Sequence, residues 1–297
     1  ERGAENRMIP NIEVKGAVAK LKFLADGPIE QWLWITSDNH FDAVNCNRKS
    51  LKKHFDEAKA RDALIFVFGD WFDAMQGRFD PRRSMNEVRP EYRADNYYDL
   101  IVQDSAKFLA PYAGNIILIT DGNHETAVEK NASTNIANSL VDKLRAIGSP
   151  VRRGGYGGWV KFMFDFGMGN GPRDAKNLKY NHGRGSNAPV TRGITDTARQ
   201  AVYLPDADIV ANGHNHQAYC MPIVRERLSK QGVQSFDVAW YIRTSGYKQD
   251  YNDGTKGWAV EKNFPPTPIS GCWVHLTTEE HKIKIHCILE VDPPEVI

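Results

Sequence analysis

The chain has 297 residues, of which 41% are hydrophobic and 25% charged, so one large domain with a sizeable buried core fits its length. Its formal net charge of +1 excludes a polycation, and binding to nucleic acid would therefore need a local basic patch. Four cysteines without a Cys-x-x-Cys pair indicate neither a structural zinc site nor a secreted disulfide framework.

The termini and apolar runs bear on where the chain resides. No apolar run reaches the ~20 residues that a membrane span needs, and the N-terminus lacks a signal-peptide core. We therefore predict a cytoplasmic protein that does not bind membranes. Because the sequence begins with Glu1 rather than Met, we expect a fragment or a processed product. Residues 1–30 carry mixed charges and weak periodicity, which indicates a lead-in or the remnant of a preceding segment.

Four short apolar runs are each followed by side chains that can bind a metal. The runs cover residues 31–36, 63–68, 116–120 and 208–211, and the segments after them contain Asp38-Asn39-His40, Gly69-Asp70, Gly122-Asn123-His124 and Gly213-His214-Asn215-His216. Runs of this length and composition predict strands of one buried sheet. Such a sheet would deliver all four polar segments to one edge, which we expect to be the site.

Helical spacing separates these predicted strands. Leu51, Phe55 and Ala58 recur at helical intervals after Asn47, which is a suitable N-cap, so a strand-helix-strand unit is predicted. Apolar residues predict a second helix over residues 98–109 and a third over residues 136–147, which stops at Gly148. Residues 75–95 lack periodicity and indicate an inserted loop.

The second half of the chain changes to a period of two. Alternation predicts long strands over residues 160–168, 236–242 and 283–289. These strands favour a second, more antiparallel sheet packed on the first, with helices outside. The predicted fold is therefore α/β, a four-layer α-β-β-α sandwich of two mixed sheets with flanking helices.

The candidate metal ligands are oxygen and nitrogen donors without a thiolate. They are Asp38, His40, Asp70, Asn123, His182, His214 and His216. This donor set suits Mn(II), Fe or Zn, and a shared aspartate can bridge two ions about 3.5 to 4 Å apart. Taken singly, each aspartate or asparagine is better explained as a residue that ends a strand or caps a helix, and only the whole set favours metal binding.

Taken together, five segments resemble the calcineurin-like metallophosphoesterases. These segments are Asp38-x-His40, Gly69-Asp70-x-x-Asp73, Gly122-Asn123-His124-Glu125, His182-Gly183 and Gly213-His214-x-His216, in the order that the family has them. The resemblance implies that residues 31–297 form one metallophosphoesterase domain. It also implies a binuclear phosphoesterase with two divalent ions, Mn, Zn or Fe, as cofactors.

The resemblance further implies a division of roles among the residues. Asp38, His40, Asp70 and His216 would hold one ion, and Asp70, Asn123, His182 and His214 the other, so that Asp70 bridges them. A hydroxide between the ions would attack a phosphate ester in line. His124 follows a ligand without being one, and we expect it to act as the general acid, held by a nearby carboxylate. For Asp73 we expect a structural or positioning role.

Two further groups of residues bear on the substrate. Arg184 and Arg192 lie in glycine-containing segments after His182, where guanidinium groups would grip phosphate oxygens, although a solvated loop is the alternative. The insertion combines basic and aromatic side chains that would suit nucleotides or single strands, although a solvated face is the alternative. Its members are Phe79, Arg82, Arg83, Arg89, Tyr92, Arg93, Tyr97 and Tyr98.

Three functions remain open from the sequence. The first is hydrolysis of a phosphodiester, either a nucleotide or a nucleic acid. The second is a phosphomonoesterase, including one that acts on phosphoproteins, with the same metals and different surrounding loops. The third is a non-catalytic scaffold, which would be expected to have lost ligands or the acid, whereas this chain retains all of them. A phosphate-ester substrate is the expected partner, and the sequence does not specify the oligomeric state.

Overall fold

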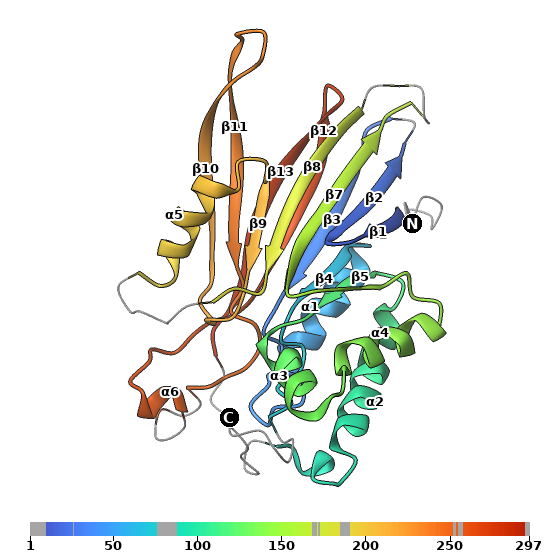
Figure 1. The fold of residues 1–297 in the computed structure, drawn as a ribbon, viewed down its shortest axis with the longest axis vertical. Helices are drawn as coiled ribbons and strands as arrows, with labels where there is room; N and C mark the ends of the chain where they lie inside the picture. The colour runs from blue at the N-terminus through green and yellow to red at the C-terminus, as the bar shows by residue number, and fades with distance from the viewer. Residues whose placement is uncertain are drawn as a thin grey trace.

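Two mixed sheets face each other, and helices cover the outer face of each sheet (Figure 1). The computed structural model describes residues 10–25, 27–75, 88–167, 171, 173–184, 191–251, 254 and 258–294. These layers confirm the predicted α-β-β-α sandwich.

The first sheet has six strands in the order β13-β12-β3-β4-β5-β6. Its strands are β3 (Glu30–Thr36), β4 (Leu64–Phe68), β5 (Ile116–Thr120), β6 (Arg152–Gly154), β12 (Ile269–Glu279) and β13 (Lys282–Asp292). Strands β3 to β6 are parallel, and β12 and β13 add an antiparallel edge. The parallel strands β4 and β5 are buried along their whole length, as their unbroken apolar sequences predict.

The second sheet has seven strands in the order β1-β2-β7-β8-β9-β11-β10. Its strands are β1 (Asn11–Lys15), β2 (Val18–Leu24), β7 (Gly157–Asp165), β8 (Arg173–Asn181), β9 (Ile209–Asn212), β10 (Tyr219–Leu228) and β11 (Gln234–Arg243). Along β7, the buried residues Val160, Phe162 and Phe164 alternate with less buried ones. This period of two directs one face of the strand toward the six-stranded sheet.

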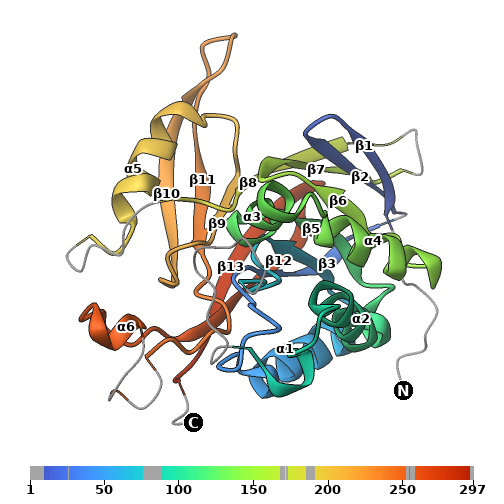
Figure 2. The ribbon, with the colours of Figure 1, turned by 60° about the horizontal axis from the view of Figure 1, so that its bottom comes forward.

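Helices lie on both outer faces of the pair of sheets (Figure 2). They are α1 (Arg48–Ala60), α2 (Tyr97–Leu109), α3 (Asn123–Ala132), α4 (Ile136–Ala146), α5 (Ile194–Tyr203) and the short α6 (Trp258–Glu261), with 3-10 turns at Pro90–Tyr92 and Ala110–Tyr112. Helix α1 begins as predicted, because the Asn47 side chain accepts a hydrogen bond from Ser50 N at 2.9 Å. Among the described residues, no helix is both long and apolar enough to cross a bilayer.

Three buried clusters correspond to the three interfaces between layers. One cluster joins α1, α2 and α4 to the six-stranded sheet through residues such as Phe55, Ile101 and Leu140. A second fills the space between the sheets, and a small third cluster around Leu204 joins the chain near α5 to β9 and β11. Each layer thus buries its apolar face against the next.

The prediction of one sheet for all four strand-end segments was wrong. Strands β3, β4 and β5 belong to the six-stranded sheet, but β9 pairs in parallel with β8 and β11 in the other one. A short apolar run fixes a buried strand without specifying its neighbours, which long-range pairing decides. The site is therefore built between two sheets and not on the edge of one.

Residues 11–24 form two strands where the sequence indicated a lead-in. Strand β2 pairs in parallel with β7 and buries Leu21 and Phe23 between the sheets. Its charged residues, which weaken the periodicity, lie on the opposite face. The strands thus complete the seven-stranded sheet and its core.

The buried face of β2 should be needed for stability. Phe23 is 0% exposed and stacks on Phe164 with ring centroids 4.9 Å apart, so Phe23→Ala should lower the free energy of unfolding by about 3–5 kcal/mol in urea denaturation. The control is Leu24→Ala on the opposite face, where the side chain is 43% exposed. Equal losses in the two variants would contradict the packing of β2 in the core.

Candidate metal centre

The loops after five strands of the two sheets meet at one end of the molecule and carry the predicted ligands. Backbone hydrogen bonds join these loops, for example from Asp38 N to Gly69 O at 3.1 Å and from Gly213 N to His182 O at 2.9 Å. Asp38 follows β3, Asp70 follows β4, and His182 follows β8. Residues that are far apart in the chain thus share one buried site.

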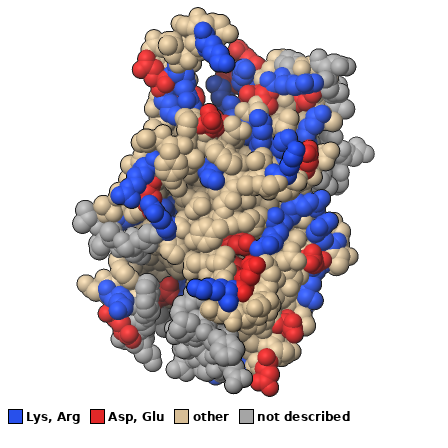
Figure 3. Space-filling model, viewed as in Figure 1, with Lys and Arg blue, Asp and Glu red and all other residues tan. Residues whose placement is uncertain are grey.

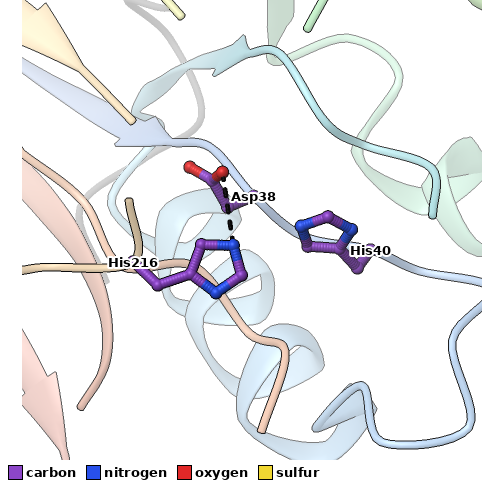
Figure 4. Close-up of side chains that lie close together, drawn as sticks. All are labelled: Asp38, His40 and His216. Carbon is purple, nitrogen blue, oxygen red and sulfur yellow. Dashed lines mark ion pairs between the residues drawn. The ribbon is translucent and has the colours of Figure 1, made fainter. Parts of the chain in front are cut away.

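Asp38, His40 and His216 form the first group of side chains in the site (Figure 4). One ligand atom from each lies within 4.8 Å of the others, and Asp38 Oδ1 lies 3.6 Å from His216 Nε2. Asp38 and His40 are buried, whereas His216 is partly exposed. The group thus combines one carboxylate with two imidazoles next to solvent.

Asp70, His182 and His214 form the second group, also within 4.8 Å of one another. His182 Nε2 lies 2.9 Å from Asp70 Oδ2. The side-chain oxygen of Asn123, at the start of α3, lies 3.0 Å from His182 Nε2 and 2.8 Å from His214 Nδ1. All four predicted ligands of the second ion therefore converge.

Asp70 connects the two groups. Besides the group with His182 and His214, it forms a third group with His40 and His124 within the same 4.8 Å limit. Its Oδ1 also accepts a hydrogen bond from the backbone N of His124 at 3.0 Å. A carboxylate that reaches residues of both groups has the position that a bridging ligand requires.

The second nitrogen of each imidazole determines which nitrogen faces the site. His182 Nδ1 lies 3.1 Å from the carbonyl oxygen of Phe68 and donates to it, which leaves Nε2 toward Asp70. His40 Nδ1 lies 2.9 Å from Asp73 Oδ1, whereas its Nε2 is buried without a hydrogen-bond partner among the described residues. This pattern is typical of histidines oriented for metal binding.

Burial and neighbouring charges set the protonation of the imidazoles. Burial lowers the pKa of His40 and, together with the charge of His182, that of His214, so both favour the neutral form that binds metals. Burial alone would lower the pKa of His182, but Asp70 and Asp38 outweigh it and raise this pKa to about 10. A cation that binds Asp70 would compete with this proton.

The backbone of the site is held in an unusual conformation. Five of the predicted ligands have positive φ angles: Asp38 51°, His40 44°, Asp70 50°, His214 77° and His216 53°. Residues other than glycine adopt this left-handed region uncommonly, and such strain concentrates at functional sites. Gly122 and Gly213 pack so closely that a Cβ atom would collide with the carboxylates of Asp70 and Asp38 respectively.

His124 lies next to both groups. Its Nδ1 donates to the backbone carbonyl of Asp73, and the carboxylate of Asp73 lies 4.0 Å away. Its Nε2 lies 3.9 Å from Asp70 Oδ2 and thus faces the site. With Nδ1 held by the carbonyl, Nε2 is the nitrogen available for proton transfer.

Glu125 joins two of the loops. Its carboxylate is 4% exposed and accepts three backbone hydrogen bonds, from Asp70 N at 3.0 Å, Phe72 N at 3.0 Å and Gly122 N at 2.8 Å. Burial and the charge of Asp70 raise the pKa of Glu125 to about 8. This side chain fixes the start of α3 against the loop after β4.

Two residues near the site were missed from the sequence. Asp250 Oδ2 lies 3.4 Å from His216 Nδ1, and Lys248 Nζ lies 2.8 Å from Asp73 Oδ1 and 3.6 Å from Asp250 Oδ1. Burial would raise the pKa of Asp73, but Lys248 and His40 hold it below its usual range. The available signal was a polar segment after the strand β11, the same pattern as at the other loops.

The predicted substrate residues differ in position. Arg184 lines a cavity beside α5, and Arg192 is exposed in the turn before that helix. Phe79, Arg82 and Arg83 of the insertion lie outside the described residues. Arg89 donates to the carbonyls of Ala43 and Cys46, and Tyr92 and Tyr97 are buried. Arg89, Tyr92 and Tyr97 therefore have structural roles, and nucleic-acid binding by the insertion stays a prediction.

The residues present fit divalent cations. Buried carboxylates such as Asp38 and Asp70 require compensating charge, and Nε2 of His40 has no hydrogen-bond partner among the described residues, so its lone pair can bind a cation. Oxygen and nitrogen donors without a thiolate suit Mn, Fe or Zn. A separate group, His54, Glu290 and Asp292, meets the same distance limit elsewhere.

Comparisons with known proteins agree with this geometry. A family model described as calcineurin-like phosphoesterase matches residues 32–218. No curated protein matches the chain.

Similar solved structures include a conserved protein of Streptococcus pneumoniae described as a predicted phosphoesterase, with 11% identity and a TM-score of 0.30. That match covers 88% of this chain and 99% of the other. Vacuolar protein sorting 29 from Cryptosporidium parvum has 11% identity and a TM-score of 0.36, over 89% of this chain and 99% of the other.

The role of Glu125 in holding the loops can be tested by its removal. Glu125→Ala leaves three buried N–H groups without an acceptor, so the free energy of unfolding should fall by about 3 kcal/mol or more in urea denaturation. Glu129→Ala removes an exposed carboxylate from the same helix and should change the free energy of unfolding by about 0.5 kcal/mol or less. A Glu125→Ala protein as stable as the control would disprove this role.

Proposed function

The chain belongs to the calcineurin-like phosphoesterases, and on this premise we propose that it is a binuclear phosphodiesterase that acts on a nucleotide or nucleic acid. The observation that carries the proposal is the position of Asp70, which reaches His182 and His214 on one side and His40 and His124 on the other. Membership of a family does not by itself identify the substrate, so the substrate has to be inferred from the residues of the site.

Seven side chains would hold the two cations. Asp38, His40 and His216 would bind one ion, Asn123, His182 and His214 the other, and Asp70 both. When bound, the cations would offset the negative charge of the phosphate and acidify a water, so that hydroxide is available near neutral pH. Asp73 and Asp250 would orient His40 and His216 through the second nitrogen of each ring.

His124 would supply the proton for the leaving oxygen. Its Nδ1 is held by the carbonyl of Asp73, so the ring cannot turn without losing that hydrogen bond. Its Nε2 faces Asp70 and thus the side of the site where the ester would lie. A positioned acid of this kind accelerates a reaction by about 10² to 10⁴-fold.

The surroundings of His182 support a substrate with more than one negative group. Arg184, two residues further on, lines a cavity whose walls carry several cationic side chains. Such walls favour ligands that extend beyond one phosphate, as nucleotides and nucleic acids do. All predicted ligands and His124 are present, which supports catalysis over a scaffold role.

Metal-stripped protein reloaded with Mn, Zn or Fe tests the proposed reaction. We expect no turnover without metal and, after reloading, faster hydrolysis of bis(p-nitrophenyl) phosphate than of p-nitrophenyl phosphate. Single- and double-stranded DNA and cyclic nucleotides complete the substrate panel. A monoester rate higher by a wide margin would favour the phosphomonoesterase, and no turnover of any ester with metal bound would favour the scaffold.

His124→Ala tests the assignment of the acid. The metal content, measured by mass spectrometry, should be unchanged, and kcat for a dinucleotide should fall about 10² to 10⁴-fold. A p-nitrophenyl diester should lose much less, because its leaving group departs readily without a proton. His281→Ala, an exposed histidine, is the control. Equal losses with both leaving groups would remove His124 from this role.

A further inference from the structure

A cavity of about 340 Å³ lies beside α5, on the outer face of the seven-stranded sheet. Its walls include Lys179 on β8, Arg184 after β8, Arg199 on α5 and Arg243 at the end of β11. Asp196 is the one carboxylate among the lining residues that the structure describes. Figure 3 shows basic side chains on the surface over α5. Four cations against one carboxylate make the cavity suited to an anion.

Arg243 is the buried cation of this cavity. Its side chain is 1% exposed, and neither Nε nor Nη1 has a hydrogen-bond partner among the described residues. Its Nη2 lies 3.9 Å from Asp196 Oδ2, which is too far for a hydrogen bond. Removing a charged group from water without satisfying its donors is costly, so these donors are expected to have a ligand.

The strand pattern explains how an arginine comes to lie here. Along β11, Ile242 faces the core between the sheets, whereas Tyr241 belongs to the cluster near α5. Arg243 at the end of the strand lies close to Gly193, because a Cβ on that glycine would be 3.0 Å from Nη1. The same Cβ would be 2.5 Å from Asn215 Nδ2, a second buried donor without a partner among the described residues.

We propose that this cavity binds a phosphate group, with Arg243 as its main ligand and Lys179 and Arg199 as supporting donors. A guanidinium can give two parallel hydrogen bonds to one phosphate, from Nε with Nη2 or from Nη1 with Nη2, and each of these pairs includes one of the unpartnered N–H donors of Arg243. The volume lies near the lower end of the range for small-ligand sites, about 300 Å³ and above. The cavity is distinct from the metal centre, whose ligands are not among its lining residues.

The phosphate has two sources that share this chemistry. Gly183 lines the cavity and directly follows His182, and Asn215 lies between His214 and His216. The cavity therefore adjoins the loops that carry the proposed metal ligands, and one source is a second phosphate of the substrate, an assignment that rests on the proposed function. A separate phosphate ion or ester is the other source.

Phosphate titration of the metal-loaded protein by calorimetry tests the binding. The native protein should bind two phosphates per chain, one at the metals and one here, and Arg243→Met should bind one. Arg145→Met, an exposed arginine on α4, should bind as the native protein does. If the metal centre binds no phosphate, the native protein should bind one phosphate per chain and Arg243→Met should bind none. An unchanged count in Arg243→Met overturns the proposal.

A second variant keeps the test valid if Arg243→Met does not fold. Lys179→Met combined with Arg199→Met removes two cations from half-buried and exposed positions and should weaken one phosphate site roughly tenfold. Unchanged affinity at both phosphate sites in this folded variant would also overturn the proposal.

Kinetics separate the two sources. The substrates are a thymidine dinucleotide with and without a 5′-terminal phosphate, and the quantity is the ratio of their KM values. If the phosphate belongs to the substrate, Arg243→Met should change this ratio roughly tenfold, whereas Arg145→Met should not. An unchanged ratio together with loss of one bound phosphate assigns the cavity to a separate anion. Failure of hydrolysis leaves the titration as the decisive measurement.

Discussion

The arrangement of the whole site depends on two buried carboxylates, Asp38 and Asp70. Their side chains are 0% and 2% exposed, so water cannot offset their charges. Backbone N–H groups stabilise these charges instead: His214 N donates to Asp38, and His124 N donates to Asp70. The loops that carry the imidazoles are therefore tied to the carboxylates, and strained backbone angles persist because these bonds hold them.

Much of this arrangement could be predicted from local sequence. Apolar runs that end in carboxylate, amide or imidazole identify β3, β4, β5 and β9 and the residues after them. Their order in the chain indicates the family. Asp38, Asp70 and the histidines of these segments lie in groups of side chains within 4.8 Å of one another.

The features that escaped prediction all depend on long-range pairing. The local sequence of β9 does not assign this strand to the second sheet. In β2, the charged residues on one face obscure the apolar period of the buried face. Lys248 and Asp250 reach Asp73 and His216 only because the loop after β11 folds back on the loop after β3, as the bond from Tyr247 N to Asp38 O shows. The cavity beside α5 depends equally on distant elements, because α5 covers a sheet face that carries Lys179 and Arg243 in place of apolar residues.

Because the proposed ligands come from both sheets, cation affinity would depend on the core between them. His182 and His214 follow strands of one sheet, and Asp38, Asp70 and Asn123 follow strands of the other. A swollen state that kept both sheets but lost fixed packing between them would retain its secondary structure and release the cations proposed for this site. Conversely, ions that bind only the native form would stabilise the docking of one half of the sandwich on the other by mass action.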